Sequence, residues 1–412
     1  MKRKNVSWQK YFIFILLIPF SLAVIRLIAF QAGEEFLVGT YLFSDQHHSD
    51  IAMDEKGNFV ITWEGSGQEE GSGIFARRFN NKGQPISKEF HVNTFATPGA
   101  EQYPAIAMDR RGNFVIAWFI HGPDGSMRGV FARRFNKKGE PIGKEFLVNT
   151  HTMGSQDMPS IAMDKKGNFV ITWNSYAQDG SASGVFAQRY NRKGETVGEE
   201  FQVNTYASSD QRHSDIEMDE KGNFVITWSS YGRDSSAWGI FAQMYNRKGQ
   251  PIGFEFQVNT YTKWYQWHPA IAMDEKGNFV ITWSSVGQDG STDGVFAQMY
   301  NRKGKAIGEE FQVNTYTEGK QCSPAVGMDS KRNFAITWDS LRQDGSKEGV
   351  FAQRFNRKGQ PIGFEFQVNT YTNNEQWHPV IAMDEKGNFV ITWESYGQDG
   401  SGWGVIGKMF QK

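Results

Sequence analysis

Nine aromatic and histidine side chains of this sequence share two features. They stand in polar connecting segments, and most of them interrupt an otherwise regular repeat. They are Trp264, Tyr265, Trp267, His268, Trp377, His378, His213, Trp238 and Trp403. An aromatic ring offers a flat apolar surface, and neighbouring Gln, Asn and Asp groups can fix the orientation of a bound ligand. These residues therefore predict recognition of a carbohydrate or a peptide, with local packing as the alternative interpretation.

Aspartate recurs in the same segments, usually before Gly-Ser. Four copies are candidate metal ligands: Asp179, Asp289, Asp344 and Asp399. Calcium takes about six to eight oxygen ligands, whereas each segment offers a single assured carboxylate. Turn formation is therefore favoured over Ca²⁺ binding. No spacing of His or Cys indicates zinc, and no other cofactor is expected.

An enzyme needs a unique constellation of groups, whereas a repeat presents the same side chains in every copy. Catalysis would use residues that break the repeat, such as His268 or His378 as a base beside Tyr265. Glu217 is a further candidate because it replaces the Ala found at Ala52, Ala107 and Ala162. No spacing identifies an acid–base pair or an activated nucleophile, so no catalytic residue is assigned.

The elements that position these residues follow from a repeat of 55 residues. The phrase Met-Asp-x-x-Gly-Asn-Phe-x-Ile-x-Trp occurs seven times, and a fixed period of this size indicates a repeat architecture. Arg332 is the one departure, because the other six copies have Gly there. The tryptophan that ends each phrase is expected to pack in the core.

Each repeat predicts four strands. In the fifth copy they cover residues 270–273, 278–283, 295–300 and 311–314, separated by polar or glycine-containing segments. Four antiparallel strands in each of seven repeats predict an all-β, seven-bladed β-propeller, with burial falling from the first strand to the fourth. Residues 35–38 resemble a fourth strand and 404–410 a third strand, so the N-terminal strand is expected to complete the last blade.

This topology separates the connections into two faces. The longer connections lie at one end of the ring, the long-loop face, and the short turns within strand pairs lie at the other, the short-turn face. The short turns repeat Asn-Arg-Lys-Gly, as at residues 191–194. We interpret them as a solvated surface rather than a site for an anionic polymer or a lipid. The formal net charge of −1 argues against a nucleic-acid partner.

Residues 1–32 differ from the repeats. Lys2, Arg3, Lys4 and Lys10 precede apolar runs, which indicates a signal peptide or an uncleaved membrane anchor. The propeller would then cover residues 33–412 of an exported protein that is periplasmic, secreted or on the cell surface, and would touch a membrane only through this segment. The single Cys322 excludes an intrachain disulfide.

Three repeated phrases carry a resemblance: Gly-Gln-Asp-Gly-Ser at 287–291, Phe-Ala-Gln-Arg-Phe at 351–355 and Glu-Phe-Gln-Val-Asn-Thr at 365–370. Together they resemble bacterial secreted repeat proteins taken to be β-propellers, mostly without assigned activity. The resemblance implies an exported product of the cell envelope and supplies no catalytic residues.

The leading hypothesis is a non-catalytic binding or adhesion propeller that recognises a glycan or a protein at the cell surface through its long-loop face. Repetition favours this function because several weak sites can gain avidity on a ligand with matching spacing. The alternative is a carbohydrate-active enzyme, a polysaccharide lyase or a glycosidase, that uses one asymmetric pocket on that face.

Overall fold

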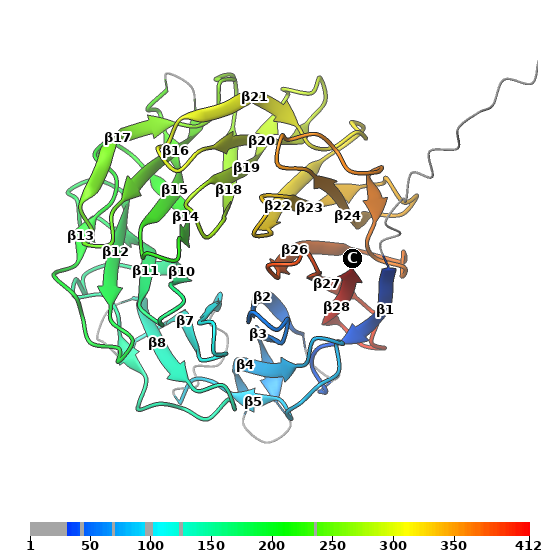
Figure 1. Cartoon of the computed structure of the whole chain (residues 1–412), viewed down its shortest axis with the longest axis horizontal. Coiled ribbons are helices and arrows are strands. Elements are labelled where there is room, and N and C mark those ends of the chain that lie inside the picture. Colours follow the sequence, from blue (N-terminus) through cyan, green and yellow to red (C-terminus); the bar gives the residue numbers. More distant parts are fainter. Residues whose placement is uncertain (1–30, 42–44, 68–70, 95–101, 123–126, 235–236) are drawn as a thin grey trace, which may run out of the picture.

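The computed structural model describes residues 31–41, 45–67, 71–94, 102–122, 127–234 and 237–412. Its strands form seven sheets of four antiparallel strands, arranged around a central axis (Figure 1). The predicted all-β, seven-bladed β-propeller is thereby confirmed. Residues 1–30 of the predicted signal or anchor lie outside the described residues. Within the described part of the chain, no helix is long and apolar enough to cross a membrane.

Each blade is built from strands in chain order, from the axis outward. Blade 1 is β2 (His47–Met53), β3 (Phe59–Gly67), β4 (Gly71–Phe79) and β5 (Phe90–His91); blade 2 is β6 (Ala105–Met108), β7 (Phe114–Ile120), β8 (Gly129–Phe135) and β9 (Phe146–Leu147); blade 3 is β10 (Gln156–Met163), β11 (Phe169–Tyr176), β12 (Ser183–Tyr190) and β13 (Phe201–Gln202).

The remaining blades repeat this order. Blade 4 is β14 (Gln211–Met218), β15 (Phe224–Tyr231), β16 (Trp238–Tyr245) and β17 (Pro251–Gln257); blade 5 is β18 (Gln266–Met273), β19 (Phe279–Val286), β20 (Asp293–Tyr300) and β21 (Ala306–Gln312); blade 6 is β22 (Gln321–Met328), β23 (Phe334–Leu341), β24 (Glu348–Phe355) and β25 (Phe366–Gln367); blade 7 is β26 (Gln376–Met383), β27 (Phe389–Tyr396), β28 (Trp403–Gln411) and β1 (Gln31–Leu37).

The Asp-x-x-Gly-Asn phrase forms the turn between the first two strands of a blade. In blade 5, Asp274 Oδ1 accepts hydrogen bonds from the backbone nitrogens of Lys276 at 2.9 Å and Asn278 at 2.8 Å. Asn278 Nδ2 donates to Asp274 Oδ2 at 2.7 Å, and Gly277 has a φ of 85°. A left-handed backbone is easiest for glycine, so the phrase contains Gly at this position.

Arg332 adopts the same left-handed conformation, with a φ of 67°, although it carries a side chain. The variant Arg332→Gly is therefore expected to raise the free energy of unfolding by about 1 kcal/mol, because the left-handed region penalises a Cβ. Urea unfolding followed by circular dichroism measures the change. The reverse variant Gly277→Arg is the matched control and should be destabilised; a stability loss in Arg332→Gly would contradict the prediction.

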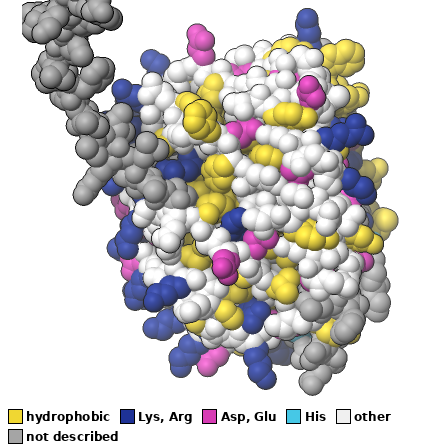
Figure 2. Space-filling model, turned by 90° about the vertical axis from the view of Figure 1, so that its right-hand side faces the viewer, with side chains coloured by type: hydrophobic (Ala, Val, Ile, Leu, Met, Phe, Trp, Pro, Cys, Tyr) yellow, Lys and Arg dark blue, Asp and Glu magenta, His cyan; other side chains and the backbone are white. Residues whose placement is uncertain are grey.

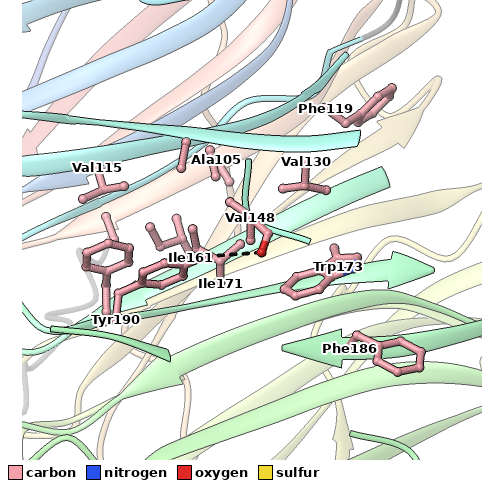
Figure 3. Close-up of a cluster of buried hydrophobic side chains, with 14 residues drawn as sticks. Ala105, Val115, Phe119, Val130, Val148, Ile161, Ile171, Trp173, Phe186 and Tyr190 are labelled. Carbon is pink, nitrogen blue, oxygen red and sulfur yellow. Dashed lines mark hydrogen bonds between the residues drawn. The ribbon is translucent and has the colours of Figure 1, made fainter. Parts of the chain in front are cut away.

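The repeated tryptophans lie in the core between blades. Trp63, Trp118, Trp173, Trp228, Trp283, Trp338 and Trp393 are each 1% exposed or less. Figure 3 shows one such core, in which Phe119 and Val130 of blade 2 face Ile161 and Trp173 of blade 3. The predicted packing role of these residues is confirmed.

Burial does not fall steadily from the first strand to the fourth, which corrects one expectation. In blade 4, β15 and β16 are almost wholly buried, whereas β14 is only half-buried and β17 is largely exposed. The cause is the ring itself: the second and third strands are pressed between neighbouring blades, while the first strand lines the central channel. Side chains on the first strands are therefore accessible from the axis.

The ring closes as predicted, because β1 pairs with β28 as the outer strand of blade 7. The contacts of the other blades are reproduced at this junction. Glu89 of blade 1 accepts a hydrogen bond from the backbone nitrogen of Thr40 at 2.8 Å, as Glu145 of blade 2 does from Thr94 at 2.8 Å. The Glu and Thr of the Glu-Phe-Gln-Val-Asn-Thr phrase thus link adjacent blades.

The N-terminal copy of the Glu-Phe-Gln-Val-Asn-Thr phrase, at residues 35–40, lacks the Asn. Elsewhere its Asn accepts a hydrogen bond from the third strand, as Asn259 does from the backbone nitrogen of Ile240 at 2.7 Å, but the N-terminal copy has Gly39. Gln46 fills the space: a Cβ on Gly39 would lie 2.5 Å from Gln46 Oε1. That oxygen accepts a hydrogen bond from the Val405 nitrogen at 3.5 Å, so the junction stays closed.

Candidate functional site

A ring of residues at the mouth of the central channel shares an unusual backbone conformation. One residue from each blade has a positive φ between 35° and 55°: His48, Tyr103, Met158, His213, His268, Ser323 and His378. We call them the mouth ring. In six blades they coincide with a register shift between the first two strands, a β-bulge. Bulky residues rarely adopt this conformation, and its repetition makes it a built feature of this face.

The mouth ring brings side chains of different blades into contact. The rings of His48 and Tyr103 stack with their centroids 3.6 Å apart, and those of His213 and His268 meet edge-on at 4.7 Å. The ring centroids of His378 and His48 are 6.2 Å apart. Side chains more than a hundred residues apart in sequence thus form one surface. Four of its seven members are histidines.

The first aromatic cluster lies at blades 4 and 5. The Trp267 ring is nearly parallel to the His268 ring at 5.2 Å, and Tyr265 lies 5.9 Å from Trp267. Trp238 reaches the same place, because its backbone forms a parallel bridge with Tyr265. The structure therefore brings together five of the nine predicted residues: Tyr265, Trp267, His268, His213 and Trp238.

Trp264 stands at the edge of this cluster under backbone strain. Its φ is 62° and its side chain is 64% exposed. The corresponding positions in four other blades also have positive φ but carry residues that tolerate it better: Gly154, Ser209, Gly319 and Asn374. A bulky side chain in the left-handed region costs stability. The Trp264 indole lies at the edge of the cluster, where a Cβ on Gly287 would be 3.5 Å from its Cδ1. Such a residue is characteristic of a functional site rather than of a fold requirement.

The second aromatic cluster lies at blades 7 and 1. The indoles of Trp377 and Trp403 are parallel within 5°, with centroids 4.7 Å apart. His378 lies 5.5 Å from Trp377, and His47 lies 5.8 Å from Trp403. The remaining predicted residues, Trp377, His378 and Trp403, thus meet in a cluster that also includes His47.

Glu394 lies beneath this cluster, and its side chain is 2% exposed. It accepts hydrogen bonds from His47 Nδ1 at 2.7 Å, His378 Nδ1 at 3.1 Å and the His48 backbone nitrogen at 2.9 Å, and Trp377 Nε1 donates at 3.3 Å. Burial would raise the pKa of Glu394, but the bonds from His378 and His47 outweigh it and hold this pKa well below its ordinary value. Glu394 is therefore an ionised anchor for the cluster.

The histidines around the mouth fall into two electrostatic groups. Burial alone would lower the pKa of His47 and His378, yet the hydrogen bonds and charge of Glu394 raise both pKa values above the ordinary one. For His213 and His268 burial prevails: it lowers their pKa values to about 4 and about 3, with help from Arg212 and from neighbouring histidines. The blade 4 and 5 cluster is thus uncharged at neutral pH, whereas His47 and His378 favour the charged form.

Blade 6 contributes a second buried acid beside the mouth. Cys322 Sγ donates to Asp339 Oδ2 at 3.0 Å, and burial raises the pKa values of both the carboxyl and the thiol. Because the thiolate is the reactive form of cysteine, Cys322 is poorly suited to act as a nucleophile.

Deeper in the channel, Asp50, Asp215 and Glu217 interact electrostatically. Burial, and to a lesser extent Asp215, raises the pKa of Glu217 to about 8 and that of Asp50 to about 7. Glu217 was a sequence candidate for catalysis beside His268, His378 and Tyr265. Among the described residues, no hydrogen bond joins it to any of the three; its carboxylate accepts one from the nitrogen of Met218 at 3.2 Å.

A hollow of about 370 Å³ opens next to His213 on the same face. Its lining residues include Arg128, Asp157, Asn174, Tyr176 and Arg212. Arg128 Nη1 lies 3.1 Å from Asp157 Oδ2, so a salt bridge spans one wall. Sequence reasoning missed these residues. A signal existed: Asp157 and Arg212 occupy the position of Trp267 and Trp377 in the repeat.

The four aspartates considered as metal ligands form turns. Asp289 Oδ1 accepts a hydrogen bond from the Ser291 nitrogen at 3.0 Å, and its carboxylate covers Gly294, where a Cβ would lie 2.6 Å from Oδ2. The equivalent contacts pair Asp179, Asp344 and Asp399 with Gly184, Gly349 and Gly404. The described residues contain no group of three or more His, Cys, Asp or Glu that could hold a metal ion.

Fold and site together define a β-propeller whose channel mouth is rich in histidine and tryptophan. No known protein family matches the sequence, and no curated protein matches it either. Solved structures match the fold. A protein of unknown function from Dyadobacter fermentans DSM 18053 is 10% identical with a TM-score of 0.55, and the match covers 93% of this chain and 99% of that one.

Two glycoside-processing enzymes show a similar likeness. The GH93 α-L-arabinofuranosidase of Fusarium graminearum, solved with arabinobiose, is 12% identical with a TM-score of 0.51, over 76% of this chain and 92% of that one. The α-L-arabinanase of Penicillium chrysogenum, also with arabinobiose, is 12% identical with a TM-score of 0.50, over 74% and 92%. At these identities the likeness shows the propeller fold alone.

Proposed function

We propose that this chain is a non-catalytic binding propeller of the bacterial cell envelope that recognises a glycan through its long-loop face. One observation carries the proposal: Trp264 is 64% exposed and holds a left-handed backbone that four other blades assign to Gly, Ser or Asn. The fold does not require tryptophan here, since Gly, Ser or Asn takes the equivalent position in four other blades. A sugar ring stacking on it would account for its presence.

The rest of the face suits the same ligand class. Tyr265 and the half-buried Trp267 add aromatic surface beside Trp264, and the parallel indoles of Trp377 and Trp403 form a second flat surface across the mouth. Sugars combine apolar ring faces with hydroxyl groups, so aromatic plates near imidazoles and amides complement them. Two separate plates also favour an extended glycan with more than one sugar unit in contact.

The carboxylates at the mouth support binding over catalysis. Glu394 accepts four hydrogen bonds, and Asp339 accepts one from the Cys322 thiol, so both acids are committed to protein groups. The alternative, a carbohydrate-active enzyme, draws support from one observation: Asp339 has a raised pKa and Glu394 a lowered one, and both interact with His378. Opposed pKa values in neighbouring acids are typical of acid–base pairs.

A glycan array and a polysaccharide pull-down with the full chain test the proposal. The variants Trp264→Gly, Trp267→Ala and Trp377→Ala are each expected to weaken binding about tenfold, because a buried aromatic contact is worth roughly that much at a binding surface. Phe254→Ala is the matched control, since Phe254 is 94% exposed but lies on β17 at the outer rim.

Unchanged binding in all three tryptophan variants, or an equal loss in Phe254→Ala, would remove the glycan site from the long-loop face. The same incubations are checked for newly released reducing ends. Release that disappears in Glu394→Gln and Asp339→Asn would replace the binding function with the enzymatic alternative. Capture without release supports the proposal.

A further inference from the structure

Charge is segregated on this molecule. The six turns between third and fourth strands, at residues 80–84, 136–140, 191–195, 246–250, 301–305 and 356–360, hold twelve Lys or Arg and two Glu, although the whole chain has a net charge of −1. All six lie on the short-turn face. Figure 2, a side view, shows more Lys and Arg side chains on the left and lower edges of the molecule than on the right edge.

The acids of this face are largely engaged within the fold. The Asp of each turn between the first two strands accepts hydrogen bonds within that turn. Asp219, for example, accepts them from the backbone nitrogens of Lys221 at 2.9 Å and Asn223 at 2.8 Å. Near the axis, Lys165 of blade 3 pairs with Glu275 of blade 5 and with Glu385 of blade 7, the latter at 3.0 Å. The acids therefore neutralise the centre of the face and leave its periphery basic.

The peripheral cations line hollows between adjacent blades. One, of about 770 Å³, is lined by Lys276, Arg302, Lys331, Arg332, Arg357 and Lys358 among others. A second, of about 400 Å³, includes Arg111, Lys166, Arg192 and Lys193, and a third, of about 320 Å³, includes Lys221, Arg247 and Lys248. Each hollow also carries Asn side chains. Such sites match the negative charge and acceptor oxygens of a phosphate group.

The chain enters the propeller at this same face. Gln31 opposes Gln411 at the start of β1. Gln411 Nε2 donates to the carbonyl of Asn81, in the second short turn of blade 1, at 3.2 Å, and the Lys412 nitrogen donates to Asn388 Oδ1, in the first short turn of blade 7, at 3.0 Å. The apolar segment of the sequence ends at Phe30, directly before this point.

We propose that the short-turn face docks on an anionic phospholipid surface, with the long-loop face turned away from it. The basic hollows supply the attraction, and a membrane anchor in the preceding apolar segment would hold this face against the lipid. Phe254 and Phe364, each 94% exposed, stand on the outer rim in the half of the blade next to this face. The inference goes beyond glycan binding and does not rest on it.

Flotation of the full chain with vesicles tests the docking. Vesicles of phosphatidylcholine alone are compared with vesicles that also contain phosphatidylglycerol, at low and high salt. We expect several-fold more bound protein on the anionic vesicles, with the excess lost at high salt. The variant Arg302→Glu/Lys303→Glu/Lys305→Glu/Arg357→Glu/Lys358→Glu should lose that excess, because all five side chains are exposed on the short-turn face.

The matched control is Lys263→Glu/Lys320→Glu, which reverses exposed lysines on the long-loop face and should keep the excess. Circular dichroism verifies that the reversed variant is folded. An excess that survives in the short-turn variant would overturn the proposal. So would tight capture of soluble polyphosphate with no preference for anionic vesicles, because the face would then bind a free polyanion and not a lipid surface.

Discussion

Replacing Trp283 by alanine is expected to lower the free energy of unfolding by about 3–5 kcal/mol, the range for deleting a large aromatic side chain from a packed core. Trp283 is fully buried, and it packs with Phe296, Ile271 and Met244, so the change affects the interface of blades 4 and 5. The cavity cannot collapse easily because it is enclosed by strands on both sides. Loss of one such residue should loosen two neighbouring blades.

Chemical unfolding followed by far-ultraviolet circular dichroism measures this loss. The matched control is Trp264→Ala, which removes the same side chain from an exposed position and should leave stability unchanged or slightly higher. A small effect of Trp283→Ala, comparable with that of the control, would contradict the assignment of the repeated tryptophans to the core.

The variant Glu394→Gln is expected to lower stability by about 1–2 kcal/mol near pH 6, because it removes the charge that the partly exposed imidazoles of His47 and His378 share. Gln can retain part of the hydrogen bonding, so the electrostatic contribution is the main loss. The Glu394 side chain is 2% exposed, but those of His47 and His378 are 31% and 50% exposed, so solvent screens part of this interaction.

The loss should depend on pH in a defined way. The lowered pKa of Glu394 contributes stability above the pKa of an unfolded carboxyl, and that contribution disappears as the pH falls. The raised pKa values of His47 and His378 contribute stability below the unfolded histidine value of 6.5, and that contribution disappears as the pH rises through the folded values. The difference between wild type and variant should therefore be largest between about pH 5 and pH 6.5.

Thermal unfolding of both proteins across this range measures the difference. Glu64→Gln is the matched control, since Glu64 is the equivalent residue of blade 1 but its side chain is 21% exposed. Its replacement should lower stability less than that of Glu394. A difference that does not change with pH would show that Glu394 acts through packing alone.

Repetition explains why the sequence was sufficient to predict the fold. The Asp-x-x-Gly-Asn turn, the buried Trp and the inter-blade Glu occur in copy after copy. The closure by β1 could be predicted because the chain begins with a fourth-type strand and ends with a third-type strand. Burial order was predicted wrongly, because apolarity alone does not distinguish a strand that lines a channel from one pressed between sheets. The β14 and β15 strands illustrate the difference.

The site was predicted only in part. The nine aromatic and histidine residues were found because they break the repeat, and the structure gathers eight of them into two clusters with Trp264 at the edge. The Glu394 network was not predicted, since its bond to His47 joins residues 347 positions apart and exists only after ring closure. The mouth ring was also missed: His, Tyr, Met and Ser at that position give no sequence signal for a left-handed backbone.

Trp264→Gly offers the most direct test of the proposed function. The glycan with the strongest array signal is titrated into wild type and variant by calorimetry, and the Tm of each protein is measured without ligand. We predict opposite signs: affinity falls about tenfold, while Tm is unchanged or rises because glycine relieves the left-handed strain. Unchanged affinity, or a fall in Tm together with affinity, would contradict the account, because Trp264 would then serve the fold and not the ligand.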